Sequence, residues 1–216
     1  MRELWPGDNY ALALAYFQTG LPDGGFSLLQ GNLHHDMFHY MSPGTLGSHN
    51  GGTDFNDIVH PAARAIVEGL WGIRPDLPNG KIEIAPQLSP DWDNASATTP
   101  QVTIHAQGFR QASSSGTTSL SVAVHARMHC PGCLLRLVLP LRAAQLNGVT
   151  LNGNPASNYT IERGFGQAVV VVRTLVPATP SEAVVAALRF RGAHGYVPAV
   201  AVQRKAGGLV NRRQRR

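Results

Sequence analysis

The pattern of apolar and polar positions changes once along the chain, near residue 75. Before that point apolar residues recur at the spacing of three to four that is typical of helices, and after it they alternate with polar residues as in strands. The alternation predicts strands at residues 81–85, 102–106, 119–128, 134–139, 168–173 and 184–190. Because no helical stretch separates them, we expect an α+β protein whose second part is an antiparallel β-sandwich.

Three helices are predicted before residue 72. The first covers residues 10–17 with Asp8 as its N-cap, and the second covers about 26–40 after a tight connection at 21–25. The third covers about 54–71, with a bend or a restart at Pro61. The first helix is apolar almost all round, which is typical of a helix enclosed on every side. Three helices of this length do not enclose it, so we expect further helices from upstream sequence or from another chain.

Turn signals and charge define the domain boundaries. Residues 73–80 contain two prolines and an Asn-Gly pair, and they separate a helical segment, 1–75, from a β-sandwich, 76–205, and a disordered basic tail, 206–216. Residues 1–93 hold eleven of the thirteen acids but only four of the eighteen bases, which also indicates two different units. Two further pairs, Asn147-Gly148 and Asn152-Gly153, are expected to be turns between strands.

Several classes of partner are disfavoured. No apolar run reaches the roughly 18 residues that cross a bilayer, and the N-terminus has no signal-peptide core, so no membrane partner is expected and the cellular location stays open. The arginine-rich tail is accompanied by no aromatic interleaving, helix-turn-helix pattern or finger spacing, so no nucleic-acid partner is expected.

Metal and redox sites are weakly indicated. His35 and His39 have the i, i+4 spacing of two ligands on one helix face, but nothing in the spacing requires a third, and pocket lining is favoured. Cys130 and Cys133 form a CxxC flanked by strand-like residues rather than by the helix of a redox motif. We interpret it as a turn whose thiols are free or paired locally, and we expect no metal or other cofactor.

The densest group of chemically useful side chains lies between residues 51 and 60. The start of the first helix, the end of the second and the start of the third should meet at one end, where aromatic, amide, imidazole and carboxylate groups then gather. Such a mixture suits sugars, which offer apolar ring faces for stacking and hydroxyls for hydrogen bonds. The residues expected there are Trp5, Asp8, His49, Asp54, Asn56, Asp57 and His60.

The acidic residues have two readings. Asp54 and Asp57 either cap and stabilise the first turn of their helix or contact a substrate. Glu68 follows Arg64 by four residues, so an ion pair along the helix is favoured over a role in the site.

Four motifs of residues 5–93 are distinctive together. They are Trp5-Pro6-Gly7-Asp8-Asn9-Tyr10-Ala11-Leu12-Ala13, the run from Gly51 to His60, Val67-Glu68-Gly69-Leu70-Trp71-Gly72-Ile73-Arg74-Pro75-Asp76, and Ile84-Ala85-Pro86-Gln87 with Asp91-Trp92-Asp93. In these motifs and their order the segment resembles the end of the catalytic domain of bacterial six-hairpin glycosidase-like proteins, which include α-L-rhamnosidases and glycogen-debranching-like hydrolases. The resemblance implies an (α/α)6 toroid, of which this chain would hold the last helices, followed by a C-terminal sandwich.

The resemblance implies the C-terminal part of a glycoside hydrolase that acts on oligo- or polysaccharides by acid/base catalysis without a cofactor. Asp54 and Asp57 would be its candidate catalytic carboxylates, and the other residues of the group would bind the carbohydrate substrate. A complementary acid or base would come from the rest of the toroid, so the chain alone is expected to be inactive. The alternative is a non-catalytic carbohydrate-binding or structural β-sandwich module, with Trp92 and Phe109 as a stacking face.

Overall fold

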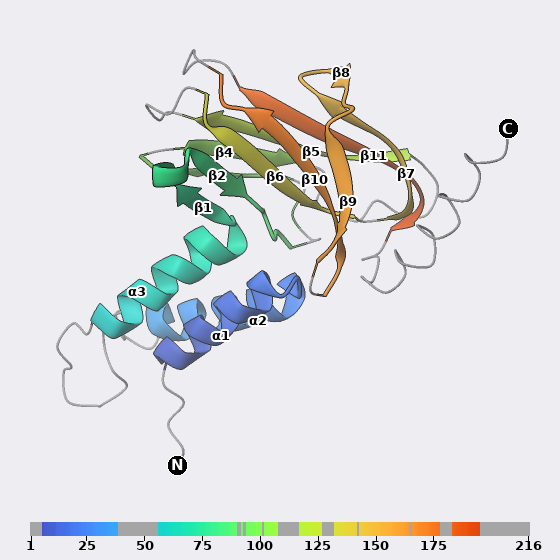
Figure 1. Cartoon of the computed structure of the whole chain (residues 1–216). Coiled ribbons are helices and arrows are strands. Elements are labelled where there is room, and N and C mark those ends of the chain that lie inside the picture. The colour runs from blue at the N-terminus through green and yellow to red at the C-terminus, as the bar shows by residue number, and fades with distance from the viewer. Residues whose placement is uncertain are drawn as a thin grey trace, which may run out of the picture. The chain divides into compact units, whose positions relative to one another are not determined.

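The protein has an α+β fold in which helices come first and a mostly antiparallel β region follows, as predicted (Figure 1). The computed structural model describes residues 6–38, 56–89, 92, 94–100, 102–107, 117–126, 132–141, 143–164, 166–177 and 183–194. The chain divides into two compact units. The helical unit comprises Met1–Arg74 and Pro86–Ser89, and the β unit comprises Pro75–Ala85 and Pro90–Arg216.

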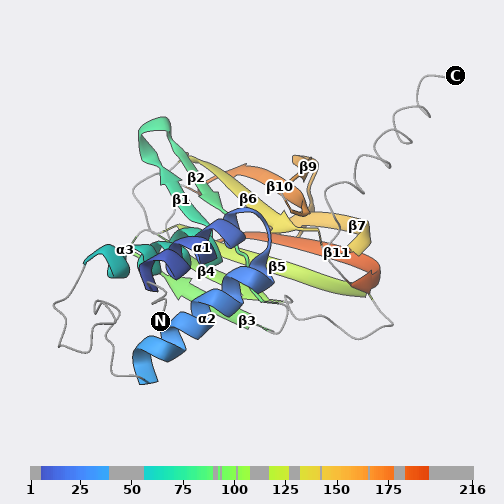
Figure 2. The same cartoon turned by 90° about the horizontal axis from the view of Figure 1, so that it is seen from below.

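The helical unit is built on α1 (Pro6–Gln18), which contacts both α2 (Pro22–Phe38) and α3 (Asn56–Arg64). The helix of α3 continues as a π-helix over Ala65–Leu70. Figures 1 and 2 show α1 and α3 running in the same direction and α2 running in the opposite direction. The starts of α1 and α3 and the end of α2 therefore lie at one end of this unit.

Three details of the helices differ from the sequence interpretation. Helix α1 begins at Pro6, so Asp8 lies within the first turn and is not the N-cap. Helix α2 begins at Pro22, a residue well suited to a first helical position, so residues 22–25 belong to the helix and not to a connection. Pro61 lies inside α3 without ending it, and the irregularity follows at Ala65 as the π-helix.

Helix α1 is enclosed on one side only. Tyr10, Ala13 and Phe17 are almost fully buried within the unit, whereas Leu12 is 46% exposed and Ala15 is also exposed. The described residues thus leave one side of this helix uncovered, as the sequence predicts for three helices of this length. Among the described residues, no helix is long and apolar enough to cross a membrane.

The β unit contains two sheets that lie as two layers (Figure 2). The five-stranded sheet has the order β1-β2-β6-β10-β9, in which β2 and β6 pair in parallel and β10 pairs antiparallel with both of its neighbours. Its strands are β1 (Ile73–Asp76), β2 (Lys81–Ile84), β6 (Leu134–Pro140), β10 (Ala168–Leu175) and β9 (Tyr159–Arg163). The expected purely antiparallel sandwich thus carries one parallel pair.

The six-stranded sheet has the order β3-β4-β5-β11-β7-β8, and all of its described pairings are antiparallel. Its strands are β3 (Asn94–Thr98), β4 (Val102–Gln107), β5 (Thr117–Ala126), β11 (Val184–His194), β7 (Ala143–Leu151) and β8 (Asn154–Pro155). Alternate residues of both sheets, such as Leu137, Val172, Ile104 and Leu188, are fully buried and form the core of the β unit.

The two Asn-Gly pairs have different roles. Asn152 and Gly153 both have positive φ, 51° and 80°, and they form the two-residue turn between β7 and β8, as expected. Asn147 and Gly148 lie inside β7, because β11 pairs Arg189 with Gly148 and Phe190 with Leu146. The prediction of a turn there is wrong: Asn147 is the additional residue of a β-bulge.

Candidate functional site

The sequence analysis expects the candidate site residues, from Trp5 to His60, at the end of the helical unit where α1 and α3 begin. Trp5, His49 and Asp54 lie outside the described residues. Asn56 and Asp57 form the start of α3, although their side chains are not among those described. The backbone arrangement brings the starts of both helices to one end (Figures 1 and 2), which is the arrangement that the helix order predicts.

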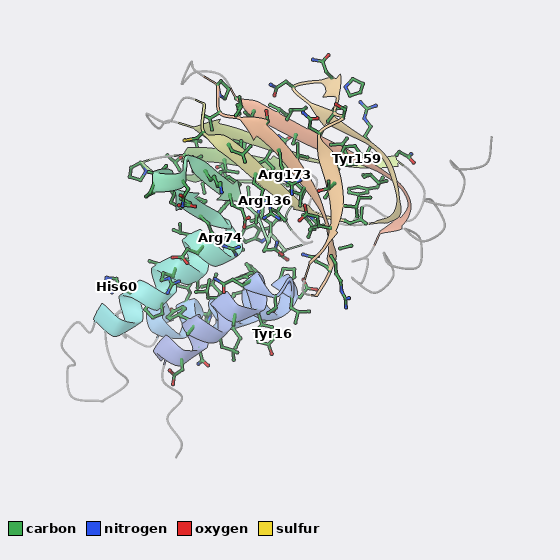
Figure 3. The ribbon with its side chains drawn as sticks, viewed as in Figure 1. Tyr16, His60, Arg74, Arg136, Tyr159 and Arg173 are labelled. Atoms are coloured by element: carbon green, nitrogen blue, oxygen red, sulfur yellow. The ribbon has the colours of Figure 1, made fainter. Side chains whose placement is uncertain are left out.

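Asp8 and His60 are the two members of this group whose side chains are described, and both are exposed. Asp8 lies in the first turn of α1, where a carboxylate interacts favourably with the helix dipole. His60 lies near the start of α3 (Figure 3). In the described chain, neither side chain is enclosed in a pocket, so any substrate held here needs additional walls.

An amide pair joins α1 to α2 in this half of the unit. Nδ2 of Asn9 donates a hydrogen bond of 3.2 Å to Oδ1 of Asn32. Nδ2 of Asn32 is buried and has no hydrogen-bond partner among the described residues. A buried donor without an acceptor costs roughly 1–3 kcal/mol, so a further acceptor beside Asn32 would stabilise the unit.

The predicted ion pair between Arg64 and Glu68 is confirmed. Nε and Nη2 of Arg64 each donate a 2.8 Å hydrogen bond to one oxygen of the Glu68 carboxylate. These hydrogen bonds lower the pKa of Glu68 below its ordinary value and raise the pKa of Arg64. Glu68 therefore belongs to the helix surface and is not a candidate acid catalyst.

Metal and redox candidates add little to the site. The part of the chain that the structure describes contains no group of three or more His, Cys, Asp or Glu side chains that would hold a metal ion. His39 and the side chain of His35 lie outside it. Cys133 is disulfide-bonded, and the only other cysteine in the sequence is Cys130, which also lies outside the described residues.

A row of paired charges crosses four strands of the five-stranded sheet, with two arginines on the inner strands and a glutamate on each outer one. Arg136 on β6 contacts Glu83 on β2 and, at 3.0 Å, Glu162 on β9. Glu162 also accepts a 2.5 Å hydrogen bond from Nη2 of Arg173 on β10. Arg136 and Arg173 are opposite each other in the β6–β10 pairing, and both are labelled on the sheet in Figure 3.

Glu162, on the edge strand β9, pairs with both arginines, and its pKa is lowered. The hydroxyl of Thr160 donates a 2.8 Å hydrogen bond to its carboxylate, and hydrogen bonds from Arg173 and then Arg136 act in the same direction. A lowered folded-state pKa means that the carboxylate stabilises the fold above its ordinary pKa. This stabilisation is lost as the pH falls through the lowered value.

Replacing Glu162 with glutamine should therefore reduce stability at neutral pH by less than about 1 kcal/mol, since the groups are partly exposed. The difference between Glu162→Gln and the parent protein should begin to shrink as the pH falls below the ordinary pKa of a glutamate, and it should disappear below the lowered pKa of Glu162. Urea unfolding between pH 7 and pH 3 measures this difference. A difference that is constant over that range would contradict the proposed pairing.

Beside this row the surface is hollowed into a pocket of about 650 Å³. It lies where β6 begins, β7 and β10 end and β9 begins. Sequence reasoning missed it, because its residues come from four strands and carry no motif. The lining residues are Leu134, Leu151, Ser157, Asn158, Tyr159, Thr160, Arg173, Thr174 and Leu175.

Comparison with known proteins does not identify a family for this chain. No protein-family model matches the chain. No curated protein matches it either.

Proposed function

We propose that this chain is the C-terminal portion of a glycoside hydrolase, comprising the last helices of an (α/α)6 toroid and an accessory β-sandwich. Asp54 and Asp57 are the candidate carboxylates of the active site. Trp5, Asp8, His49, Asn56 and His60 are its candidate sugar-binding residues. The chain alone is expected to be inactive, because further helices complete the site.

The observation that carries this proposal is the meeting of the starts of α1 and α3 at one end of the helical unit. Asp57 lies in the first turn of α3, and Asp8 lies in the first turn of α1. Helix starts that meet at one rim bring carboxylates and hydrogen-bonding groups from distant parts of the sequence to one place. A glycosidic bond is cleaved between two carboxyl groups that lie roughly 5–10 Å apart, and one rim of helix ends can supply such a pair.

Two features of α1 and α2 support the additional helices. Leu12 of α1 is 46% exposed, and Leu21, directly before α2, is 48% exposed. The buried Nδ2 of Asn32 also lacks an acceptor among the described residues. Neighbouring helices packed on this unit would bury the leucines and could supply the acceptor.

In this function the protein would act by proton transfer and by orientation of the sugar. One carboxyl group protonates the leaving oxygen, and the other acts on the anomeric carbon or activates a water. Amide and imidazole groups at the same rim hydrogen-bond sugar hydroxyls, and an aromatic side chain stacks on the ring.

The test compares hydrolysis of a panel of aryl glycosides by the purified chain and by the native assembly, captured from source cells with an antibody against the β unit. We expect the captured assembly to hydrolyse an aryl glycoside and the purified chain not to. The assembly should also contain helical polypeptide in addition to residues 1–216. The proposal is wrong if the captured protein is an inactive monomer in which Leu12 of α1 is protected from solvent.

A further inference from the structure

The pocket beside Glu162 and Arg173 has the composition of a small-molecule site, and it lies entirely within the β unit. Its volume of about 650 Å³ falls within the roughly 300–1,000 Å³ of typical ligand pockets. No residue of the proposed catalytic group lines it. We propose that this pocket binds a short, uncharged oligosaccharide, independently of any hydrolysis at the helical unit.

The apolar part of the pocket suits the ring faces of sugars. Leu175 is 62% exposed, which is unusual for a leucine at the end of a buried strand, and Leu134 and Leu151 are partly exposed beside it. Tyr159, at the start of the edge strand β9, adds a partly exposed ring. An aromatic ring next to aliphatic side chains offers the CH-rich face of a pyranose a surface on which it can stack.

The polar part of the pocket carries hydroxyls and an amide. Ser157, Thr160 and Thr174 supply aliphatic hydroxyls, Tyr159 supplies a phenol, and Asn158 supplies an amide. The Ser157, Thr174, Tyr159 and Asn158 groups can both donate and accept hydrogen bonds, as sugar hydroxyls do. The Thr160 hydroxyl donates to Glu162 and can only accept from a ligand. The pocket therefore matches a ligand with many hydroxyls better than a purely apolar one.

The charge of the pocket indicates that the ligand is neutral. Arg173 is the one charged residue among those that line it, and its guanidinium donates to Glu162 at 2.5 Å and to the Thr160 hydroxyl at 3.0 Å. Because Glu162 offsets this positive charge, neither an anionic nor a cationic ligand finds an unpaired counter-charge. The same hydrogen bonds hold Arg173 and Thr160 in place before any ligand arrives, which lowers the entropy cost of binding.

The rim of the pocket is also fixed by the backbone. The N–H of Val176 donates to the carbonyl of Cys133 at 2.8 Å, and the N–H of Gly132 donates to the carbonyl of Val176 at 3.1 Å. These bonds continue the β6–β10 pairing past Leu134 and Leu175. Both leucines thus lie on a regular ladder that ends beside the disulfide-bonded Cys133.

The experiment is saturation-transfer NMR followed by calorimetry, on the purified full chain with neutral di- to tetrasaccharides of glucose, xylose, mannose and rhamnose. Uronic-acid oligosaccharides and a leucine-rich peptide are included for comparison. We expect transfer from the protein to at least one neutral oligosaccharide. Tyr159→Ala should weaken its binding about tenfold, as loss of a stacking ring does, and Tyr159→Phe should weaken it less. Leu175→Ala should also weaken it, whereas Leu77→Ala, at another exposed leucine of the β unit, should not.

Thermal unfolding confirms that each variant is folded, and Leu175→Asp, at the most exposed of the lining leucines, replaces Tyr159→Ala if that variant does not fold. Asp54→Asn and Asp57→Asn should leave this binding unchanged, so the result does not depend on the proposed hydrolase function. The proposal fails if no neutral oligosaccharide binds at millimolar concentration. It also fails if Tyr159→Ala and Leu175→Asp bind as the parent protein does, or if the acidic sugars or the peptide bind more tightly.

Discussion

Replacing Phe17 with alanine is expected to destabilise the helical unit by about 3–5 kcal/mol, the usual cost of deleting a buried aromatic ring. Phe17 is 1% exposed. A Cβ atom added at Gly25 on α2 would lie 2.9 Å from its ring, and one added at Gly69 in the π-helix would lie 2.8 Å from it. The ring therefore fills a space that two glycines keep open. Guanidinium unfolding followed by helix ellipticity measures the loss.

The glycines provide a matched control for this prediction. Gly69→Ala should cost roughly 1–3 kcal/mol, because the new methyl meets both Phe17 and Leu14. Gly31→Ala, at an exposed position of α2 with nothing within 4 Å of the new Cβ, should instead stabilise the protein by about 0.5–1 kcal/mol. Equal effects of the two replacements would show that the Phe17 ring is not seated between α2 and the π-helix.

In the proposed hydrolase assembly, Asp54→Asn or Asp57→Asn should lower kcat by roughly 10²–10⁴-fold, the contribution typical of a general acid or base. Asparagine keeps the size of the side chain and its ability to cap a helix, so the fold of α3 should be retained. Steady-state rates on the best aryl glycoside, together with their pH dependence, measure the effect. The replaced carboxylate should also remove one limb of the pH profile.

The control for these variants is Asp23→Asn, which changes an exposed acid in the first turn of α2. Helix α2 begins at the opposite end of the helical unit from α1 and α3, so this replacement should leave kcat unchanged. If Asp54→Asn and Asp57→Asn also leave kcat unchanged, the two acids serve only the helix dipole. Their replacement would then cost about 0.3–1 kcal/mol of stability and no activity.

The elements that follow a simple hydrophobic pattern could be predicted from the sequence. Strands β2, β4, β6, β10 and β11 all begin within a residue of the predicted positions, because each supplies apolar residues to a buried core, either alternately or in a short run. Helix α2 begins four residues before its predicted start, because Gly24 and Gly25 interrupt the helical pattern in the sequence. In the structure the rings of Tyr16 and Phe17 occupy the space that larger side chains at these two positions would need. Local propensity could not reveal that tertiary requirement.

The missed strands lack the pattern for identifiable reasons. Strand β1 contains Pro75, which edge strands tolerate because their outer N–H groups need no partner. Strand β9 is also an edge strand, and Thr160, Ile161 and Arg163 are all exposed. Strand β7 contains the Asn147 bulge, whose Asn-Gly pair has the composition of a turn.

The candidate sites differ in how far the sequence could identify them. The group at residues 51–60 is dense in one segment, and the helix order places it with Asp8. The pocket of the β unit draws on residues from 134 to 175, which come from strands of both sheets and adjoin only in the folded chain. Its hydroxyls and leucines are common surface and core residues, so only the folded chain brings out their combination.

The path of the chain limits how this protein can exchange parts during evolution. The polypeptide leaves the helical unit after Arg74, returns to it at Pro86 and leaves again after Ser89. In the returning segment, Leu88 is fully buried and the N–H of Gln87 donates to the carbonyl of Leu70 at 2.8 Å. A gene fusion that copied the sandwich from residue 90 would lack β1 and β2. One that copied it from residue 75 would include Pro86–Ser89, a segment of the helical unit, without the helices. Recombination should therefore transmit the two units together, as a single heritable block.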